Sequence, residues 1–260
     1  MVVSCAVAPR PLPAAPPQYG QYQQYDYGQP DLRAAVGQIF ALGNQARAQA
    51  GAAALKWDPA LAAAALQHCQ RMAAAGPISH QYRGEPDLTL RAAQAGAHFS
   101  VIEENVAFAP SAAAIHQAWM QSPGHRENLL SPDVDHVGIA LVYARGELYA
   151  VADYSAAVEN LNPAQVEARV AALVRVSGVS VLANPALARS ACSSDDDLLR
   201  APSARPAWMI RWQSSDLSRL PRALVGQLES GKFQQAAVGA CAAQEDGGAF
   251  TSYRVAVLLY

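Results

Sequence analysis

The sequence predicts an α+β protein in which helices come first and a β-hairpin follows. Apolar residues recur at three- and four-residue spacing in the first half, whereas Val137, Ile139, Leu141 and Tyr143 alternate with other residues. A turn at residues 144–147 leads into a second apolar segment. Regular strand-helix-strand alternation, which would build a parallel sheet, is missing from the pattern. With 260 residues and 52% hydrophobic residues, the chain can bury a sizeable core, although many of those residues are alanine.

Charge and hydropathy exclude two classes of function. The formal net charge is −2 and no run of Lys or Arg occurs, so the sequence offers nothing to neutralise a nucleic-acid backbone. A membrane-spanning helix needs about 20 consecutive apolar residues, and no such stretch is present. We therefore expect no nucleic-acid partner and no transmembrane segment.

The N-terminal segment, residues 1–30, is rich in Pro, Gln and Tyr and is expected to be a disordered tether. It lacks the charged start and apolar run of a signal peptide. However, Val-Val-Ser before Cys5 is similar to the boundary of a bacterial lipoprotein, where an acylated cysteine begins a flexible tether. Two interpretations stay open: a start assigned too far downstream with a lipid anchor at Cys5, or a cytosolic tail with an incidental cysteine.

Three helices are predicted in the region that follows. A polar residue that can cap a helix precedes each of them: Asp31, Asp58 and Ser111. Pro59 suits the first position of the second helix, and Gly76-Pro77 should end it. Trp57 and Trp119 are expected in the core. Residues 81–110 show no clear periodicity and are expected to be irregular.

Residues 160–260 are predicted to form a smaller α+β extension. Asn184-Pro185-Ala-Leu187 is similar to Asp58-Pro59-Ala-Leu61, and Val238-Gly239 is similar to Val137-Gly138. The extension is either a shortened, degenerate relative of the first unit or a chance resemblance in an alanine-rich sequence. The four cysteines, Cys5, Cys69, Cys192 and Cys241, lack CxxC spacing. Cys192 and Cys241 either form a disulfide in an oxidising compartment or are buried free thiols.

Histidines are the main candidates for a functional site. All six lie between positions 68 and 136. His80 follows Gly76-Pro77 and His125 follows Pro-Gly, so both are expected in loops, as is Glu104 before Asn105. Two imidazoles and a carboxylate that converge could hold a divalent metal or polarise a bound water.

A set of short motifs in a fixed order resembles the CAP superfamily (SCP-like or PR-1-like domains), in its bacterial branch, over about residues 34–156. The motifs are Asn44-Gln-Ala-Arg47, Leu55-Lys-Trp57-Asp58, Ser79-His80, Glu104-Asn105-Val106-Ala107, Trp119-Met-Gln-Ser122-Pro-Gly-His125-Arg-Glu-Asn128-Leu-Leu130 and Val137-Gly138-Ile139. The resemblance implies an α-β-α sandwich with an antiparallel sheet over residues 31–157.

The resemblance also implies a surface cleft lined by two histidines and two acids. By motif, His80 and His125 match the histidines and Glu104 matches one acid. The other acid is expected on the helix near Trp119, but residues 115–121 contain no carboxylate and Ser122 stands close to that place. The cleft is therefore expected to hold a triad.

Three functions remain open. The first is a secreted or cell-envelope protein whose cleft binds a small ligand, either a divalent metal such as zinc at His80, Glu104 and His125, or a lipid or cell-wall component. The second is a hydrolase that activates water with the same residues, although no nucleophile motif such as GxSxG is present. The third is a structural envelope protein, in which His125 caps a turn, Asn128 anchors that loop and Glu104 braces it.

Overall fold

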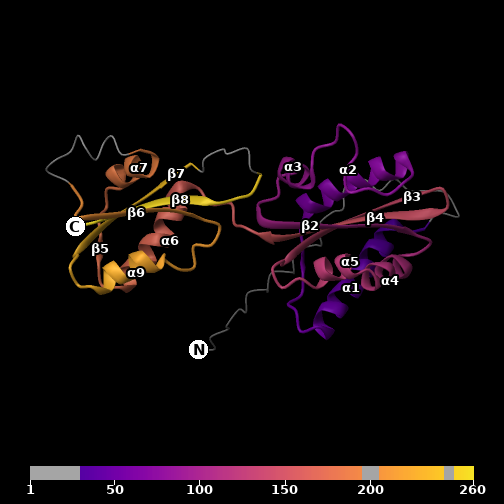
Figure 1. Cartoon of the computed structure of the whole chain (residues 1–260), viewed down its shortest axis with the longest axis horizontal. Coiled ribbons are helices and arrows are strands. Elements are labelled where there is room, and N and C mark those ends of the chain that lie inside the picture. The colour runs from indigo at the N-terminus through magenta and orange to yellow at the C-terminus, as the bar shows by residue number, and fades with distance from the viewer. Residues whose placement is uncertain (1–29, 195–204, 243–248) are drawn as a thin grey trace, which may run out of the picture.

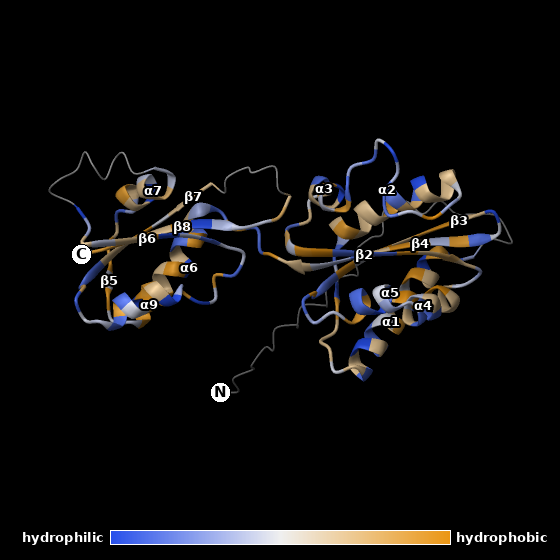
Figure 2. Ribbon diagram, viewed as in Figure 1, coloured by the Kyte–Doolittle hydropathy of each residue, from blue (hydrophilic) through white to orange (hydrophobic). Residues whose placement is uncertain are grey.

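Two successive α-β-α sandwiches make up the chain in the computed structural model, which describes residues 30–194, 205–242 and 249–260 (Figure 1). Each sandwich has one four-stranded sheet with helices on both faces. The predicted α+β class and the α-β-α arrangement of the first unit are confirmed. Hydrophobic residues dominate the strands, whereas the connecting loops are largely hydrophilic (Figure 2).

The first sandwich has the strand order β1-β3-β4-β2. Strand β1 pairs with β3 in parallel and the other neighbours are antiparallel, so the sheet is mixed rather than wholly antiparallel. Its elements are α1 (Leu32–Gln49), β1 (Lys56–Trp57), α2 (Pro59–Ala75), α3 (Leu88–Gln94), β2 (Phe99–Ala109), α4 (Ala112–Gln121), α5 (Pro123–Leu130), β3 (His136–Ala144) and β4 (Glu147–Ala157).

Capping residues start the helices where the sequence predicts. The side chains of Asp31, Asp58 and Ser111 each accept a hydrogen bond from a backbone N–H of the first turn of α1, α2 and α4. The expectation of an irregular segment over residues 81–110 is wrong, because α3 and β2 lie there. The alternation of apolar and polar residues does not reveal strand β2, because Glu104 and Asn105 are polar but buried.

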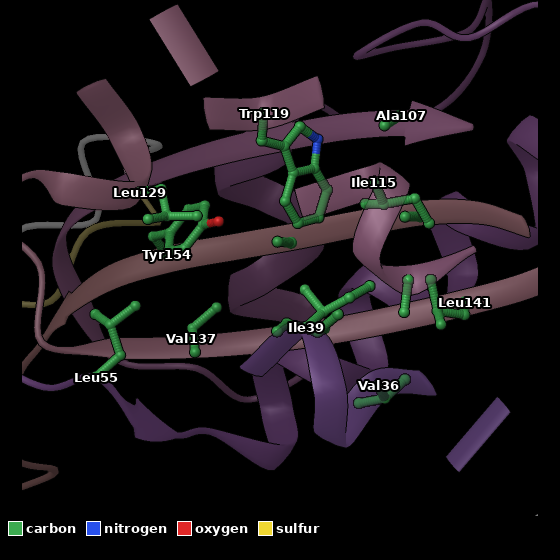
Figure 3. Packing of buried hydrophobic residues seen from close by; sticks show 14 of the residues in the cluster. Val36, Ile39, Leu55, Ala107, Ile115, Trp119, Leu129, Val137, Leu141 and Tyr154 are labelled. Carbon is green, nitrogen blue, oxygen red and sulfur yellow. The ribbon is translucent and has the colours of Figure 1, made fainter. Parts of the chain in front are cut away.

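Trp119 of α4 belongs to the core cluster that residues of α1, α5 and the sheet complete (Figure 3). Its side chain is fully buried, and its indole N–H donates to the backbone carbonyl of Val106 in β2. Trp57 packs at the margin of the same cluster, so both tryptophans belong to the core as predicted. Helix α2 covers the opposite face of the sheet with Cys69 and Met72. Helices therefore lie on both faces of the sheet beside β2, where the functional site is found.

The second sandwich has the strand order β5-β7-β8-β6, again with a short parallel first strand and antiparallel neighbours. Cys192 and Cys241 form a disulfide, and Cys69 is a buried free thiol. Cys5 and residues 1–29 of the expected tether lie outside the described residues. The elements are α6 (Pro163–Val176), β5 (Ser180–Val181), α7 (Ala186–Ser193), β6 (Trp208–Ser214), α9 (Arg222–Glu229), β7 (Gln235–Cys241) and β8 (Tyr253–Leu259).

The two sandwiches touch near the start of β2. The backbone N–H of Thr251 donates to the carbonyl of Phe99, and the rings of Phe99 and Phe250 lie 5.5 Å apart in an edge-to-face arrangement. Among the described residues, none of the helices has the length and apolarity needed to cross a bilayer.

Candidate functional site

His80, Glu104 and His125 come together at β2, one of the two edge strands of the first sheet. His80 lies in the loop after α2, on one face of the sheet, and His125 lies on α5, on the other. His80 Nδ1 is 2.8 Å from Glu104 Oε1, and the two imidazole rings have their centroids 6.4 Å apart. The structure therefore brings together all three residues that the sequence singled out.

His80 is an exposed imidazole held from behind by a buried carboxylate. Its side chain is 60% exposed, whereas that of Glu104 is 3% exposed. The hydrogen bond to Glu104 raises the pKa of His80 above its ordinary value, although burial opposes the shift. Because Nδ1 is engaged by Glu104, Nε2 is the nitrogen available to a ligand.

His125 lies in the first turn of α5 rather than in a loop as expected, because the helix begins at Pro123. A proline suits the first turn of a helix, where its missing N–H has no role. Partial burial, and then the charge of His80, lower the pKa of His125. At neutral pH its imidazole is therefore uncharged and able to act as a ligand or a proton acceptor.

Two asparagines attach α5 to the outer edge of β2. Asn105 donates to the backbone carbonyl of His125 at 2.8 Å. Asn128 donates to the carbonyl of Glu104 and to the side-chain oxygen of Asn105, both at 3.1 Å. The anchoring expected of Asn128 is present, and its target is the strand itself. These bonds set the position of His125 relative to Glu104.

Arg47 holds the C-terminal end of α5. It is fully buried, and its guanidinium donates to the backbone carbonyls of Leu129 and Ser131 at 3.0 and 2.8 Å. Burial lowers the pKa of Arg47 from its ordinary value. Because α1 carries this arginine, the core of the domain fixes the helix that carries His125.

Arg91 was missed by the sequence analysis. Its guanidinium is buried and lies 2.6 Å from Glu104 Oε2, and it also donates to the backbone carbonyl of His80 at 3.2 Å. Arg91 thus fixes both partners of the His80–Glu104 pair. A lone arginine in a short amphipathic segment carries no signal of such a role.

His68 braces the loop that carries His80. Its buried ring contacts Glu85 Oε1 at 2.7 Å and the carbonyl of Ser79 at 2.8 Å. Burial alone would raise the pKa of Glu85, but hydrogen bonds from His68 and from the backbone N–H of Tyr82 lower it overall. His68 is therefore a buried structural support of the site.

The first unit matches a known protein family. A model of the CAP family, described as the cysteine-rich secretory protein family, matches residues 40–154. Residues 40–154 are a CAP domain. The uncharacterized membrane protein YlbC of Bacillus subtilis (strain 168) is 32% identical over 106 residues, which cover 40% of this chain and 30% of that protein. The match thus spans less than a third of this relative's length.

Solved structures that resemble the CAP domain include two bacterial surface or extracellular proteins. An extracellular protein containing an SCP domain, from Bacillus anthracis str. Ames, is 27% identical with a TM-score of 0.45, covering 48% of this chain and 41% of the other. An outer surface protein from Borrelia burgdorferi is 17% identical with a TM-score of 0.45, covering 48% and 94%.

A second acidic residue of this CAP domain lies behind Glu104. Asp153 of β4 pairs with Glu104 in the sheet register and is fully buried. Neither of its oxygens accepts a hydrogen bond from a described residue. Burial, and then the charge of Glu104, raise the pKa of Asp153 well above its ordinary value. Position 122, close to where the second acid is expected, holds a serine whose side chain makes no capping hydrogen bond to α5.

The donor set of the CAP site is small. Within the described residues, no group of three or more His, Cys, Asp or Glu side chains is placed to hold a metal ion. Glu104 is already bonded to His80 and Arg91, so the two imidazoles are the donors that face a ligand. The other histidines have other surroundings: His98 contacts Thr251, His136 contacts Asp135, and Nε2 of His116 is buried without a described partner.

Proposed function

We propose that the CAP domain binds a small ligand through His80 and His125, in a protein of the bacterial cell envelope or exterior. A divalent cation such as zinc is the ligand that paired imidazoles suit best. The bond between His80 Nδ1 and Glu104 Oε1 carries this proposal, because it orients an exposed imidazole beside a second one.

The arrangement of Glu104 behind His80 is the one found behind many histidine ligands. A carboxylate bonded to one ring nitrogen fixes the tautomer and makes the other nitrogen more basic. Arg91 and Asn128 hold Glu104 from two sides, so the orientation is maintained without a ligand. Two protein donors leave the remaining coordination positions to water or to groups of a larger ligand. We therefore expect weak binding of the free ion, tightened by a lipid or cell-wall molecule that supplies further donors.

Export is supported by the disulfide between Cys192 and Cys241, since such bonds persist in oxidising compartments. The matching family is that of the cysteine-rich secretory proteins, and the B. subtilis relative is named a membrane protein. An acylated Cys5 would tether the CAP domain to the envelope, which is the lipoprotein version of the proposal.

Isothermal titration with zinc tests the site. We expect saturable heat with the unaltered protein, none with His80→Ala or His125→Ala, and an affinity about tenfold weaker with Glu104→Gln, because the orienting carboxylate is lost. His136→Ala is the matched control, since His136 also contacts a carboxylate but belongs to a different cluster. Equal heat in His80→Ala and the unaltered protein would remove the cation from the proposal.

A lipid or cell-wall ligand without a metal remains testable on the same variants. Co-sedimentation with peptidoglycan and with lipid vesicles, in the presence of EDTA, should then depend on His80 and His125 and be unchanged in His136→Ala. Equal binding by the unaltered protein and by the His80, His125 and His136 variants would show that the two imidazoles do not form the ligand site.

A further inference from the structure

The segment that enters β8 in the second unit lies against the CAP domain where α3 leads into β2 (Figure 1). Thr251 donates its backbone N–H to the carbonyl of Phe99 at 2.7 Å, and its hydroxyl oxygen lies 3.3 Å from His98 Nδ1. The ring of Phe250 packs edge-to-face on that of Phe99. The second unit therefore holds residues 98 and 99 by backbone and side-chain contacts together.

The start of β2 has a second attachment to the same unit. Val158, directly after β4, belongs to the core of the second unit, and its N–H donates to the carbonyl of His98 at 2.8 Å. The pairing of β2 with β4 is irregular between Phe99 and Val101. Because such an irregularity disrupts the ladder locally, the contacts with the second unit help to fix the start of this strand.

Helix α3 has little apolar surface of its own to hold it in place. It is seven residues long, and its buried residues are Arg91 and Ala92. So short a helix is not stable by itself and depends on tertiary contacts. Ala92 lies in a small hydrophobic cluster with Ala97 and Phe99, and Ala249 of the second unit packs against that cluster. The second unit thus completes the surface on which α3 rests.

Arg91 connects the position of α3 to the histidine site. Its guanidinium lies 2.6 Å from Glu104 Oε2 and donates to the backbone carbonyl of His80 at 3.2 Å. Ala92, the next residue, belongs to the cluster that the second unit completes, so a shift of α3 moves the guanidinium relative to both partners. Glu104 would then lose a donor to its buried carboxylate, and the ring of His80 would lose its fixed orientation.

We propose that the second unit positions the His80–Glu104 pair of the CAP site through α3. Phe250 and Ala249 are the positioning residues, and Arg91 is the link to the pair. The second sandwich, which contains no histidine, is in this view a support for the site of the first. The consequence for binding rests on the function proposed above, whereas the geometry of the pair can be measured without a ligand.

Nitrogen NMR signals of the His80 ring in the full chain test the proposal without a metal. They report which ring nitrogen carries the proton, and so depend on the bond between Nδ1 and Glu104. We expect Phe250→Ala to move them towards the average of the two tautomers, and Phe250→Tyr, which keeps the edge-to-face contact, to leave them in place. Phe250 is half exposed, so both variants should fold. Phe233→Ala is the matched control, because Phe233 packs against the core of the second unit.

Isothermal titration with zinc measures the consequence for binding. We expect an affinity about threefold to fivefold weaker in Phe250→Ala, because the carboxylate is loosened rather than removed. Ala249→Gln, which places a longer polar side chain against the cluster, should have the same effect. In an Arg91→Lys protein the link is already broken, so adding Phe250→Ala should change the affinity by less than about twofold.

Three results would overturn the proposal: identical His80 ring signals in Phe250→Ala and the unaltered protein, an equal change of those signals in Phe233→Ala, or full additivity of Phe250→Ala with Arg91→Lys. The first would show that the pair does not depend on the second unit. The second would assign the effect to a general loss of stability, and the third to a route that bypasses Arg91. A lack of zinc binding by the unaltered protein would instead remove the cation, and the ring signals would still decide whether the second unit positions the pair.

Discussion

The surroundings of Asp153 disfavour the charged form of its carboxyl group. It is fully buried, its oxygens accept no hydrogen bond from a described residue, and Glu104 lies opposite it in the sheet. A protonated Asp153 can donate to Glu104, which would reconcile the buried site with two carboxyl groups. The proton must leave on unfolding at neutral pH, because the exposed carboxyl has an ordinary pKa.

We predict that Asp153→Asn stabilises the protein, because its amide donates to Glu104 at every pH. A raised pKa in the folded state means that stability falls as pH rises from the ordinary aspartate pKa towards the folded value. At pH 7 the gain should be about 1–3 kcal/mol, the usual cost of a poorly partnered buried polar group. Urea unfolding at pH 4, 5.5 and 7 should show the gain growing with pH. Asp133→Asn, an exposed control, should change stability little; a gain independent of pH would refute the protonation argument.

At the scale of elements, one glycine in each hairpin lets a helix lie directly on the sheet. A Cβ on Gly138 would lie 2.0 Å from the backbone N of Ala62 in α2, and one on Gly239 would lie 2.2 Å from the backbone carbon of Ala188 in α7. The sequence resemblance between Val137-Gly138 and Val238-Gly239 therefore has a common physical basis. In both units the glycine meets the second helix near its start.

Substitution of either glycine by alanine should be severely destabilising, by about 3 kcal/mol or more, because helix backbone has to move away from the sheet. Gly37→Ala in α1 and Gly226→Ala in α9 are controls for the two units. A Cβ at either position meets nothing within 4 Å. The higher helix propensity of alanine should therefore raise the free energy of unfolding by about 0.5–1 kcal/mol. Thermal unfolding measures all four. A Gly138→Ala protein as stable as Gly37→Ala would contradict the close packing.

Local signals predicted part of the fold and of the site. Caps at Asp31, Asp58 and Ser111 act within one turn, so a single sequence reveals them. Glu104, by contrast, is buried only because Arg91 and His80 reach it from separate elements. Periodicity does not reveal such tertiary pairing, which is why the sequence predicts an irregular segment where β2 lies and gives no signal for Arg91 or Asp153.

At the scale of the whole molecule, the two sandwiches repeat one plan with different contents. The first has a histidine site beside the edge strand β2, while the second contains no histidine. We propose a domain boundary between residues 157 and 160, with contacts across it centred on Phe99 and Phe250. The second unit has its own hydrophobic clusters and its own disulfide, as a separately folding unit requires.

Removal of the disulfide tests this boundary. Cys192 and Cys241 are 49 residues apart in sequence, and a closed loop of that length stabilises a fold by about 4 kcal/mol through the unfolded state. In Cys192→Ala/Cys241→Ala, hydrogen exchange should accelerate in β7 and β8 while β3 and β4 keep their protection. Cys69→Ala is the reciprocal control, because this buried thiol packs only in the first core and should loosen β3 and β4 instead. Equal loss of protection in both sheets after removal of the disulfide would mean that the two sandwiches unfold as one, since a shared cooperative transition exposes both cores together.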